Sequence, residues 1–300
     1  MLTGILAGLA AGALWGLVFV APRMVTGYSS VDLTAGRYVA YGLLAAAVML
    51  LSRLAGKRRS RLPTARQALT ALGMSVLGFS GYYLLLAMAI RDAGTEVPSL
   101  VIGTIPVWIM LLGKPRHLRW GALLPGLGLT LAGLLLMMGA THSGAADGGG
   151  HYWRGMALVT VSMLSWTAFA ILNSAWLKRH PDVNATDWAN WLGVATGLGA
   201  LVMWLAAGSD VHTLVAQDDS AAFVLLCMAT GFGSAWLATI LWTIASQRLS
   251  ASLCGQLIVS ETMFALLYSF AWDGHWPTPA QLAACVLFTG GILASIRAHR

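Results

Sequence analysis

The chain has 300 residues, of which 58% are hydrophobic and only 10% are charged, and its mean hydropathy is +0.73. Because a soluble domain carries about 25% charged residues, this composition excludes one and is typical of a protein embedded in a membrane. A spanning helix needs roughly 20 mostly apolar residues, so the length suits about ten spans with short connections. The net charge of +7 would also suit nucleic-acid binding, but the basic residues cluster at the ends of apolar segments, which indicates membrane topology instead.

Apolar windows bounded by charged or turn residues predict ten transmembrane helices. In chain order they cover residues 3–22, 31–52, 67–90, 96–113 and 120–140, then 154–177, 186–207, 221–246, 249–271 and 279–297. The first window has no basic cluster before it, so it predicts a spanning helix rather than a cleaved signal peptide. The glycine-rich stretch at 144–152 predicts a linker between a first five-helix unit, 1–143, and a second, 153–300.

The positions of Lys and Arg predict the orientation, since positively charged loops stay in the cytoplasm. With the N-terminus inside, the outer side receives only Arg23, Arg37, Arg91 and Arg154, so fourteen of the eighteen basic residues lie inside (18 − 4). We therefore expect both termini in the cytoplasm and a location in a bacterial inner membrane, surrounded by lipid.

The two halves resemble each other at offsets between 151 and 155. Gly4 precedes Trp15 as Gly155 precedes Trp166, Asp32 precedes Gly42 as Asp187 precedes Gly197, and Gly78-Phe79 recurs as Gly231-Phe232. Since five helices per unit is an odd number, the second unit must be inverted relative to the first. The pattern thus predicts an all-α membrane protein of two inverted five-helix repeats, an architecture typical of secondary transporters that bind their substrate at the repeat interface.

Glu261 is the only acid well inside a predicted span, about a dozen residues and hence roughly 17 Å along its helix. An ionisable group at that depth costs several kcal/mol unless it is paired or hydrated, so Glu261 is predicted to line a cavity or to couple transport to protons. A protonated carboxyl that packs between helices is the alternative. Gln256 and Ser260 precede it closely and are candidates for the same cavity.

Aromatic side chains supply further candidates. Eight tryptophans near helix ends predict an interfacial belt, namely Trp120, Trp153, Trp176, Trp188, Trp191, Trp204, Trp272 and Trp276. Five lie at middle depth, where each indole N–H needs a partner: Trp15, Trp108, Trp166, Trp236 and Trp242. Ordinary helix packing is the alternative for each, but the repeat-related Trp15 and Trp166 favour a cavity. Tyr82, Tyr83 and Asn173 are polar-tipped candidates beside them.

Two features concern packing and motion. Gly4, Gly8, Gly12 and Gly16 form a stripe at a spacing of four that lets another backbone approach closely. We favour internal packing over association between chains, and expect a monomer.

Pro106 lies in the middle of the fourth predicted span, where it permits a kink or hinge, although a purely structural kink is equally compatible.

Enzyme chemistry has one weak signal. Gly78-Phe79-Ser80-Gly81 resembles the Gly-x-Ser-Gly motif of rhomboid intramembrane proteases, but a serine nucleophile needs a base, and all seven histidines map to loops or termini. Intramembrane hydrolysis at Ser80 is therefore a remote alternative, and we expect no enzyme. The sequence has no metal-ligand motif, Walker loop or dinucleotide fingerprint, so we expect neither a metal nor a cofactor. The cysteines, Cys227, Cys254 and Cys285, lie in apolar segments and predict free thiols.

Several motifs, taken in order, resemble the EamA-type transporters of the drug/metabolite transporter superfamily over essentially the whole chain. They are Gly12-Ala13-Leu14-Trp15-Gly16, Ile105-Pro106-Val107, Ser260-Glu261-Thr262 and Gly290-Gly291-Ile292-Leu293. Thr262 stands where the family often has proline, and Lys114-Pro115 where Gly-Glu is common.

Within that family the tryptophan-rich chain is most similar to the YddG-type exporters of aromatic amino acids. The resemblance implies a central cavity lined by the first, third, fourth, sixth, eighth and ninth spans, and export of Phe, Tyr and Trp by alternating access. Broad efflux of drugs or metabolites is the alternative, because an aromatic pocket also suits many amphipathic solutes.

Overall fold

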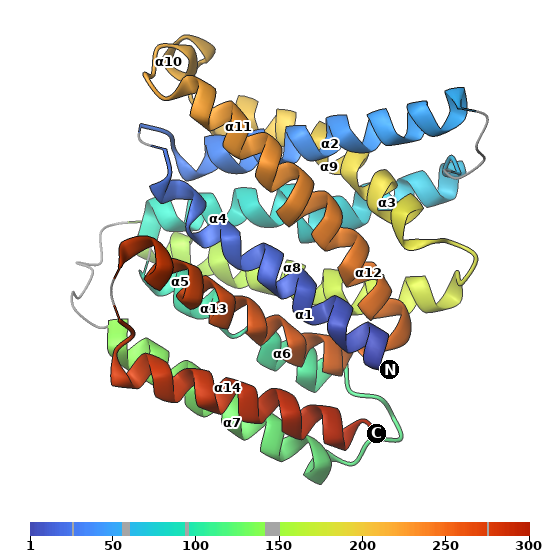
Figure 1. Ribbon diagram of the computed structural model, residues 1–300, viewed down its shortest axis with the longest axis vertical. Helices are drawn as coiled ribbons and strands as arrows, with labels where there is room; N and C mark the ends of the chain where they lie inside the picture. Colours follow the sequence, from blue (N-terminus) through green and yellow to red (C-terminus); the bar gives the residue numbers. More distant parts are fainter. Residues whose placement is uncertain (26, 56–60, 94–95, 142–150, 275) are drawn as a thin grey trace.

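The computed structural model describes residues 1–25, 27–55, 61–93, 96–141, 151–274 and 276–300, and within these ranges every regular element is a helix. The long helices lie alongside one another, and the N- and C-termini lie at the same end of the bundle, called the terminal end below (Figure 1). Nine helices of the described ranges are long and apolar enough to cross a membrane, and Pro98–Leu112 is a shorter apolar helix. The prediction of an all-helical membrane protein with about ten spans is confirmed at this level.

The first half begins with α1 (Leu2–Gly16), which continues into two 3₁₀ turns, η1 (Leu17–Phe19) and η2 (Ala21–Arg23). The second span is α2 (Ser30–Leu54). The third consists of α3 (Ala65–Gly78) and α4 (Ser80–Ala93), the fourth of α5 (Glu96–Gly103) and α6 (Ile105–Leu112), and the fifth is α7 (Trp120–Thr141).

The second half opens with α8 (Tyr152–Arg179) and α9 (Ala185–Ala207), followed by the short helix α10 (Val211–Val215), which the sequence did not predict. The eighth span contains α11 (Ser220–Thr230), the π-helical segment η3 (Gly231–Leu237) and α12 (Ala238–Arg248). The last two are α13 (Ala251–Asp273) and α14 (Pro279–Ala298). Most of the predicted linker, 144–150, lies outside the described residues.

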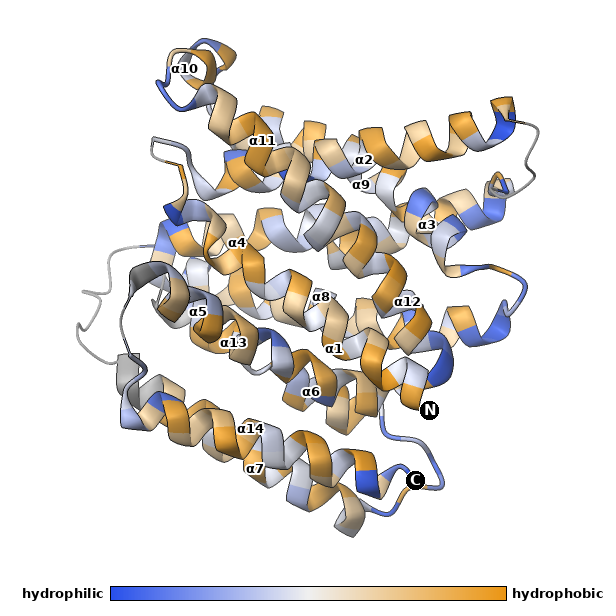
Figure 2. Ribbon diagram, viewed as in Figure 1, coloured by the Kyte–Doolittle hydropathy of each residue, from blue (hydrophilic) through white to orange (hydrophobic). Residues whose placement is uncertain are grey.

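Polar side chains mark where spans begin. At five helix starts a side-chain oxygen accepts the backbone N–H three residues on, which satisfies one of the amides that a helix leaves unpaired; the capping residues are Ser29, Thr64, Asn184, Ser250 and Thr278. Between these caps the long helices consist mostly of hydrophobic residues (Figure 2). Leu205, for example, is 79% exposed and Val286 is 70% exposed, as expected for side chains that face lipid.

Glycine contacts bring several helices close together. The backbones of α2 and α9 meet where a Cβ atom on Gly42 would lie 2.8 Å from the Cα of Gly197. The glycine stripe of α1 faces α13: a Cβ on Gly12 would collide with Ser260 Oγ, and one on Gly16 would lie 2.9 Å from the backbone nitrogen of Ala265. Because lipid tails are as apolar as the helices, the hydrophobic effect does not drive spans together in a membrane. Small residues instead let the backbones approach and pack closely. The stripe is used inside the chain.

Three spans are interrupted. The third breaks at Phe79, whose backbone angles of φ −131° and ψ −91° are not helical. The fourth breaks at Thr104, just before Pro106, because a proline cannot donate the helical hydrogen bond. The eighth widens into η3 from Gly231 onward. Such breaks in a spanning helix occur where the freed backbone groups lie inside the protein or line a cavity.

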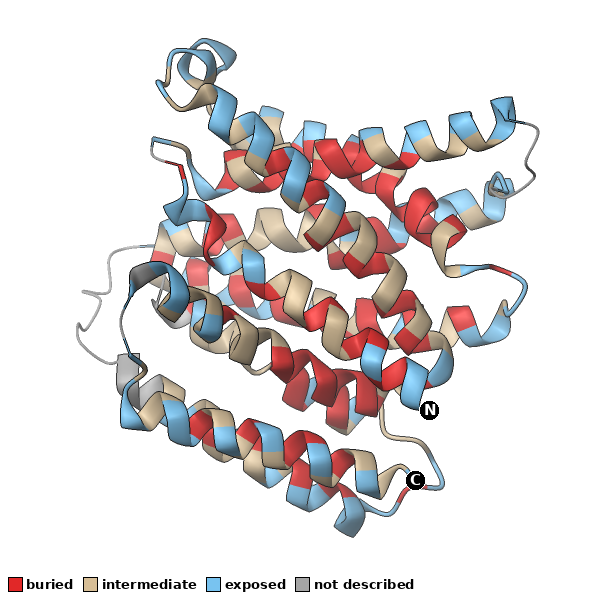
Figure 3. Cartoon of the chain, viewed as in Figure 1, coloured by how far each residue is buried: buried red, intermediate tan, exposed pale blue. Residues whose placement is uncertain are grey.

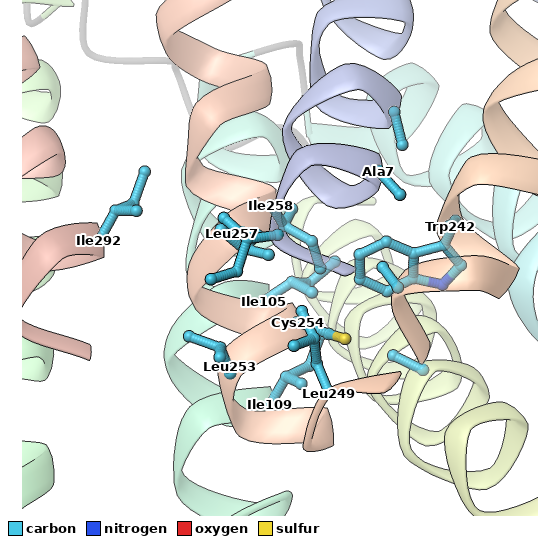
Figure 4. Close-up of a cluster of buried hydrophobic side chains, with 14 of the residues drawn as sticks. Ala7, Ile105, Ile109, Trp242, Leu249, Leu253, Cys254, Leu257, Ile258 and Ile292 are labelled. Carbon is cyan, nitrogen blue, oxygen red and sulfur yellow. The ribbon is translucent and has the colours of Figure 1, made fainter. Parts of the chain in front are cut away.

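The largest core cluster fills the bundle toward the terminal end. It joins α1, α6, α8, α12, α13 and α14, and Figure 4 shows Leu253 of α13 beside Ile109 of α6, with Ile258 of α13 on the side of Trp242 of α12. The start of α13 lies at the end of α6, since the Ser252 amide donates to the Gly113 carbonyl at 3.2 Å. The side chains of this cluster therefore fill the centre of the bundle at the terminal end.

The structure corrects one prediction about helix ends and adds to another. Arg37, counted among the outer basic residues, is a buried residue within α2, only 9% exposed, while the side of the membrane that it lies nearer stays a prediction. Trp188 and Trp191 were predicted to lie in an interfacial belt, and that prediction is wrong, because they are buried at 0% and 5% exposure and donate to Asn173 Oδ1 and the Arg61 carbonyl. Proximity to a helix end in sequence does not reveal which face of the helix a neighbouring span covers.

Candidate functional site

The candidate site lies where the packing of α13 changes. Every residue from Ser252 to Ser260 is buried, on all faces of the helix. From Glu261 onward, nearly every residue to Trp272 is half-buried or exposed, Ala265 being buried. Figure 3 shows the same change along α13, from buried near the terminal end to intermediate toward the other end. Glu261 is therefore the first polar residue beyond the tightly packed half.

A chain of aromatic rings crosses the bundle at this depth. Trp242 lies between the two repeat-related tryptophans, with ring centroids 5.3 Å from Trp15 and 6.4 Å from Trp166. Trp166 continues to Phe169 at 6.0 Å, and Phe169 to Phe79 at 5.4 Å. The separations and the tilted planes are those of favourable aromatic pairs. Helices α1, α12 and α8 and the α3–α4 break are thereby joined by one aromatic surface.

Arg37 brings a positive charge toward Glu261. The Arg37 guanidinium lies over the ring of Tyr38, with 4.7 Å between Cζ and the ring centroid, and it is within electrostatic range of the Glu261 carboxyl. Among the described residues the buried Nε of Arg37 has no hydrogen-bond partner, and Glu261 has neither a hydrogen-bond nor an ion-pair partner. Two opposite charges thus face the same region without contact.

Tyrosines from α4 share this region. Tyr82 interacts electrostatically with Glu261 and with Arg37, and it packs against the core cluster that contains Trp242. Tyr83, the next residue, packs near Tyr38 and donates a 3.3 Å hydrogen bond to the Ser30 carbonyl. Tyr82 is therefore the tyrosine that lies with the charged pair, while Tyr83 lies toward the start of α2.

Other predicted site residues lie elsewhere. Gln256 is buried between three helices, donating to Thr130 Oγ1 of α7 at 2.8 Å and accepting from Ser295 Oγ of α14 at 3.0 Å. Ser260 donates to the Leu257 carbonyl at 2.7 Å and packs against Gly12. The side chain of Gln256 is thus satisfied by α7 and α14, and that of Ser260 by the backbone of its own helix.

Asn173, Trp236 and Trp108 are also engaged locally. Asn173 Oδ1 accepts from Trp188 at 2.8 Å, and Trp236 donates to Asn190 Oδ1 at 2.8 Å. Trp108, on α6, is 40% exposed and donates to Thr104 Oγ1 at 3.2 Å, across the break beside Pro106. The structure thus gathers Trp15, Trp166, Tyr82 and Glu261, and leaves the other candidates outside this group.

Ser80 has no environment for hydrolysis. It is 6% exposed and faces Gly199 of α9, where an added Cβ would collide with its hydroxyl. The described histidines lie at helix ends, in connecting segments or in the short helix α10, and none is placed beside Ser80. In the same described ranges, no group of three or more His, Cys, Asp and Glu side chains is placed to hold a metal ion.

A separate cavity of about 270 Å³ lies between α2, α3 and α9. Its lining is almost wholly apolar and holds no charged group; it consists of Met49, Pro63, Ala68, Leu69, Leu72, Trp191, Val194, Ala195 and Leu198. Recognition of a polar solute needs placed polar groups, so this groove is not a site for one.

Sequence reasoning missed Arg37, Tyr38 and Phe79. Arg37 lay seven residues inside a predicted span, which is itself the signal of an intramembrane charge. Phe79 was noted only as part of a repeated Gly-Phe pair. Its role as the ring that joins α2 to α8 depends on the helix break, which leaves no clear mark in the sequence.

A multi-pass helical protein with charged and aromatic side chains near its centre is typical of membrane transporters. A profile of the EamA-like transporter family matches residues 2–139. The chain is 32% identical to the "Inner membrane protein YtfF" of Escherichia coli, over 99% of this chain and 96% of that one. This chain therefore belongs to the EamA-like transporter family, whose members are transporters and not enzymes.

Two more distant relatives are also named as an exporter or a transporter. The chain is 23% identical to a "Probable terminal-alkyne amino-acid exporter" of Streptantibioticus cattleyicolor, over 94% of this chain and 92% of that one. It is 24% identical to an "Uncharacterized transporter YdfC" of Bacillus subtilis, over 81% and 76% of the two chains. A solved crystal structure with 21% identity covers 98% of both chains at a TM-score of 0.77, which shows that the fold is shared.

Proposed function

We propose that the protein exports amino acids, aromatic ones foremost, across the bacterial inner membrane by alternating access. The observation that carries the proposal is the change of packing at Glu261, near aromatic rings and within electrostatic range of the buried Arg37, whose Nε has no hydrogen-bond partner among the described residues. Aromatic surfaces suit an aromatic side chain, and charged groups suit the polar end of an amino acid. The resemblance to YddG-type exporters and the relative named as an amino-acid exporter support the same substrate class.

An inverted repeat is part of the proposal. Reciprocal contacts support it: Asp32, in the first turn of α2, accepts from Ser209 after α9, while Asp187, in the first turn of α9, accepts from Arg61 after α2. The repeat-related Gly42 and Gly197 meet each other, as residues on a twofold axis must. The repeated Gly-Phe pairs also mark the breaks in the third and eighth spans.

We place both termini in the cytoplasm. The terminal end carries the predicted inner basic residues, including Arg61, Lys178, Arg179 and Arg248, whereas Asp92 and Arg154 pair at 2.6 Å at the other end. Positively charged segments stay inside. With this orientation the packed core cluster closes the cytoplasmic side, and the looser half of the bundle faces outward.

Reconstituted liposomes test the function directly. Liposomes that contain the purified protein should take up labelled phenylalanine and exchange it for internal phenylalanine, whereas liposomes without the protein should not. A panel of leucine, arginine and aspartate, together with an amphipathic dye, then measures selectivity. If no amino acid moves while the dye does, the protein is a broad efflux transporter and the proposal is wrong.

A further inference from the structure

We propose that Arg37 and Glu261 are the two poles of a site for a free α-amino acid. The Arg37 guanidinium binds the carboxylate of the substrate, and the Glu261 carboxylate binds its ammonium group. This assignment rests on the proposed amino-acid export, and it narrows the substrates to those in which both groups are unblocked.

The state of Arg37 is the first support. A guanidinium carries five N–H donors, and in a low-dielectric interior an unpaired one is costly. Arg37 is nine-tenths buried, and its Nε has no partner among the described residues. The ring of Tyr38 stabilises the cation and the Tyr38 hydroxyl also interacts with the guanidinium, but Nε remains without an acceptor. The arginine is therefore held ready for an anion, and a planar carboxylate matches its paired donors.

The relation of Glu261 to Arg37 is the second support. The two side chains come from helices with different neighbours, since α2 packs on α9 and η3, and α13 packs on α1, α6 and α14. They are within electrostatic range, yet they form no ion pair. Tyr82 of α4 interacts with both charges. A ligand that lies between the charges must therefore offer an anion to one helix and a cation to the other.

A zwitterion meets this requirement best. Its ammonium and carboxylate are separated by one carbon, so both can be matched at once and the net charge of the site remains unchanged. A ligand with only one of the two groups leaves one protein charge unpaired in the membrane interior. Loss of a hydrogen bond to a charged group should weaken binding by about 10- to 100-fold. The side chain of the amino acid would lie toward Trp15 and Trp166.

A binding competition on the full-length protein tests the proposal. Labelled phenylalanine is displaced by unlabelled phenylalanine, 3-phenylpropionate, which lacks the ammonium, phenethylamine, which lacks the carboxylate, and N-acetylphenylalanine. Wild-type protein should bind each analogue about 10- to 100-fold more weakly than phenylalanine. Analogues that bind as tightly as phenylalanine would overturn the two-pole assignment without any variant.

Variants then assign each pole. Glu261→Gln should narrow the gap between phenylalanine and 3-phenylpropionate but not the gap to phenethylamine, and Arg37→Gln should do the reverse. Arg37→Lys, which keeps the charge, should retain part of the wild-type pattern. Asp92→Asn and Arg154→Gln, which break an ion pair at the far end of α4 and α8, are matched controls and should leave all ratios unchanged.

The outcomes separate the two proposals. If Glu261→Gln and Arg37→Gln weaken all four ligands by the same factor, the residues are structural and the assignment is wrong. If the double variant binds phenylalanine as well as the wild type, the charges merely neutralise each other, and the assignment is again wrong. If wild-type protein neither binds nor transports any amino acid, the proposed function itself has failed.

Discussion

The fourth span and the ninth span show opposite patterns of burial. In the fourth, Leu100 to Thr104 are half-buried, whereas Ile105 to Met110 of α6 are buried apart from Trp108. In the ninth, the order is reversed: the first part of α13 is buried and the part after Glu261 is looser. The chain direction of the two spans is opposite, so both buried parts lie toward the terminal end (Figure 1).

This reversal shows that packing, and not composition, distinguishes the two ends. Both spans are predominantly apolar, and the tightly packed half of α13 itself contains the polar Gln256, so a difference in hydrophobicity does not explain why one end is tightly packed and the other loose. If the spans are repeat-related, a symmetric protein would bury corresponding parts equally. In alternating access, a state that is open to one side of the membrane packs one of two equivalent segments tightly and the other loosely. The state open to the opposite side would reverse which segment is tightly packed.

Cysteine labelling gives the largest expected contrast. In a protein whose three native cysteines are replaced, Thr262→Cys should react with a membrane-impermeant maleimide added outside intact cells, and Leu257→Cys should not. The reason is that Leu257 is fully buried in the core cluster, whereas Thr262, just beyond Glu261, is half-buried. Protection of Thr262→Cys by phenylalanine would place the solute there. Rapid outside labelling at Leu257→Cys would contradict the closed terminal end.

A larger side chain on the glycine stripe should disturb the boundary between the two parts of α13. Gly12→Leu inserts four carbons where even a Cβ collides with Ser260 Oγ, and overpacking of this kind costs about 1–3 kcal/mol or more. The apparent melting temperature in detergent and the uptake of phenylalanine should both fall. Gly73→Leu is the matched control, because a Cβ there meets nothing within 4 Å. Equal losses in both variants would show that the α1–α13 contact is not special.

The fold was readable from the sequence to a greater extent than the site was. Spans can be predicted because their signals are local in the sequence: about 20 consecutive apolar residues, and polar caps such as Ser29 and Thr278. Site residues depend on which face of a helix its neighbours cover. Gln256 and Asn173 looked like cavity residues, yet Thr130 and Trp188 satisfy them, and Arg37 looked peripheral, yet it is buried beside the centre.

Asp32 and Asp187, in the first turns of α2 and α9, offer a test of the repeat that underlies the comparison. Asp32→Asn and Asp187→Asn each weaken charge-assisted hydrogen bonds to a helix start and to a loop of the other half. Weakened hydrogen bonds at a helix N-terminus cost about 1 kcal/mol, so thermal unfolding should show two similar, modest decreases. Asp210→Asn serves as a control, since the Asp210 side chain makes no capping hydrogen bond. A decrease for only one of the two variants would argue against equivalent roles.

The smallest expected effect concerns the aromatic surface at the boundary. Trp15→Leu removes a partly buried ring that pairs with Trp242 at 5.3 Å and packs against the largest core cluster. Since an aromatic pair contributes about 0.5–1.5 kcal/mol beyond its buried area, the KM for phenylalanine should rise about 2- to 10-fold while that for leucine changes little. Trp153→Leu, at a ring that is 80% exposed, controls for the loss of a tryptophan. A parallel rise for leucine and phenylalanine would mean that Trp15 shapes the bundle without contacting the aromatic part of the solute, and the preference for aromatic amino acids would then have to originate at Tyr82 or Trp166.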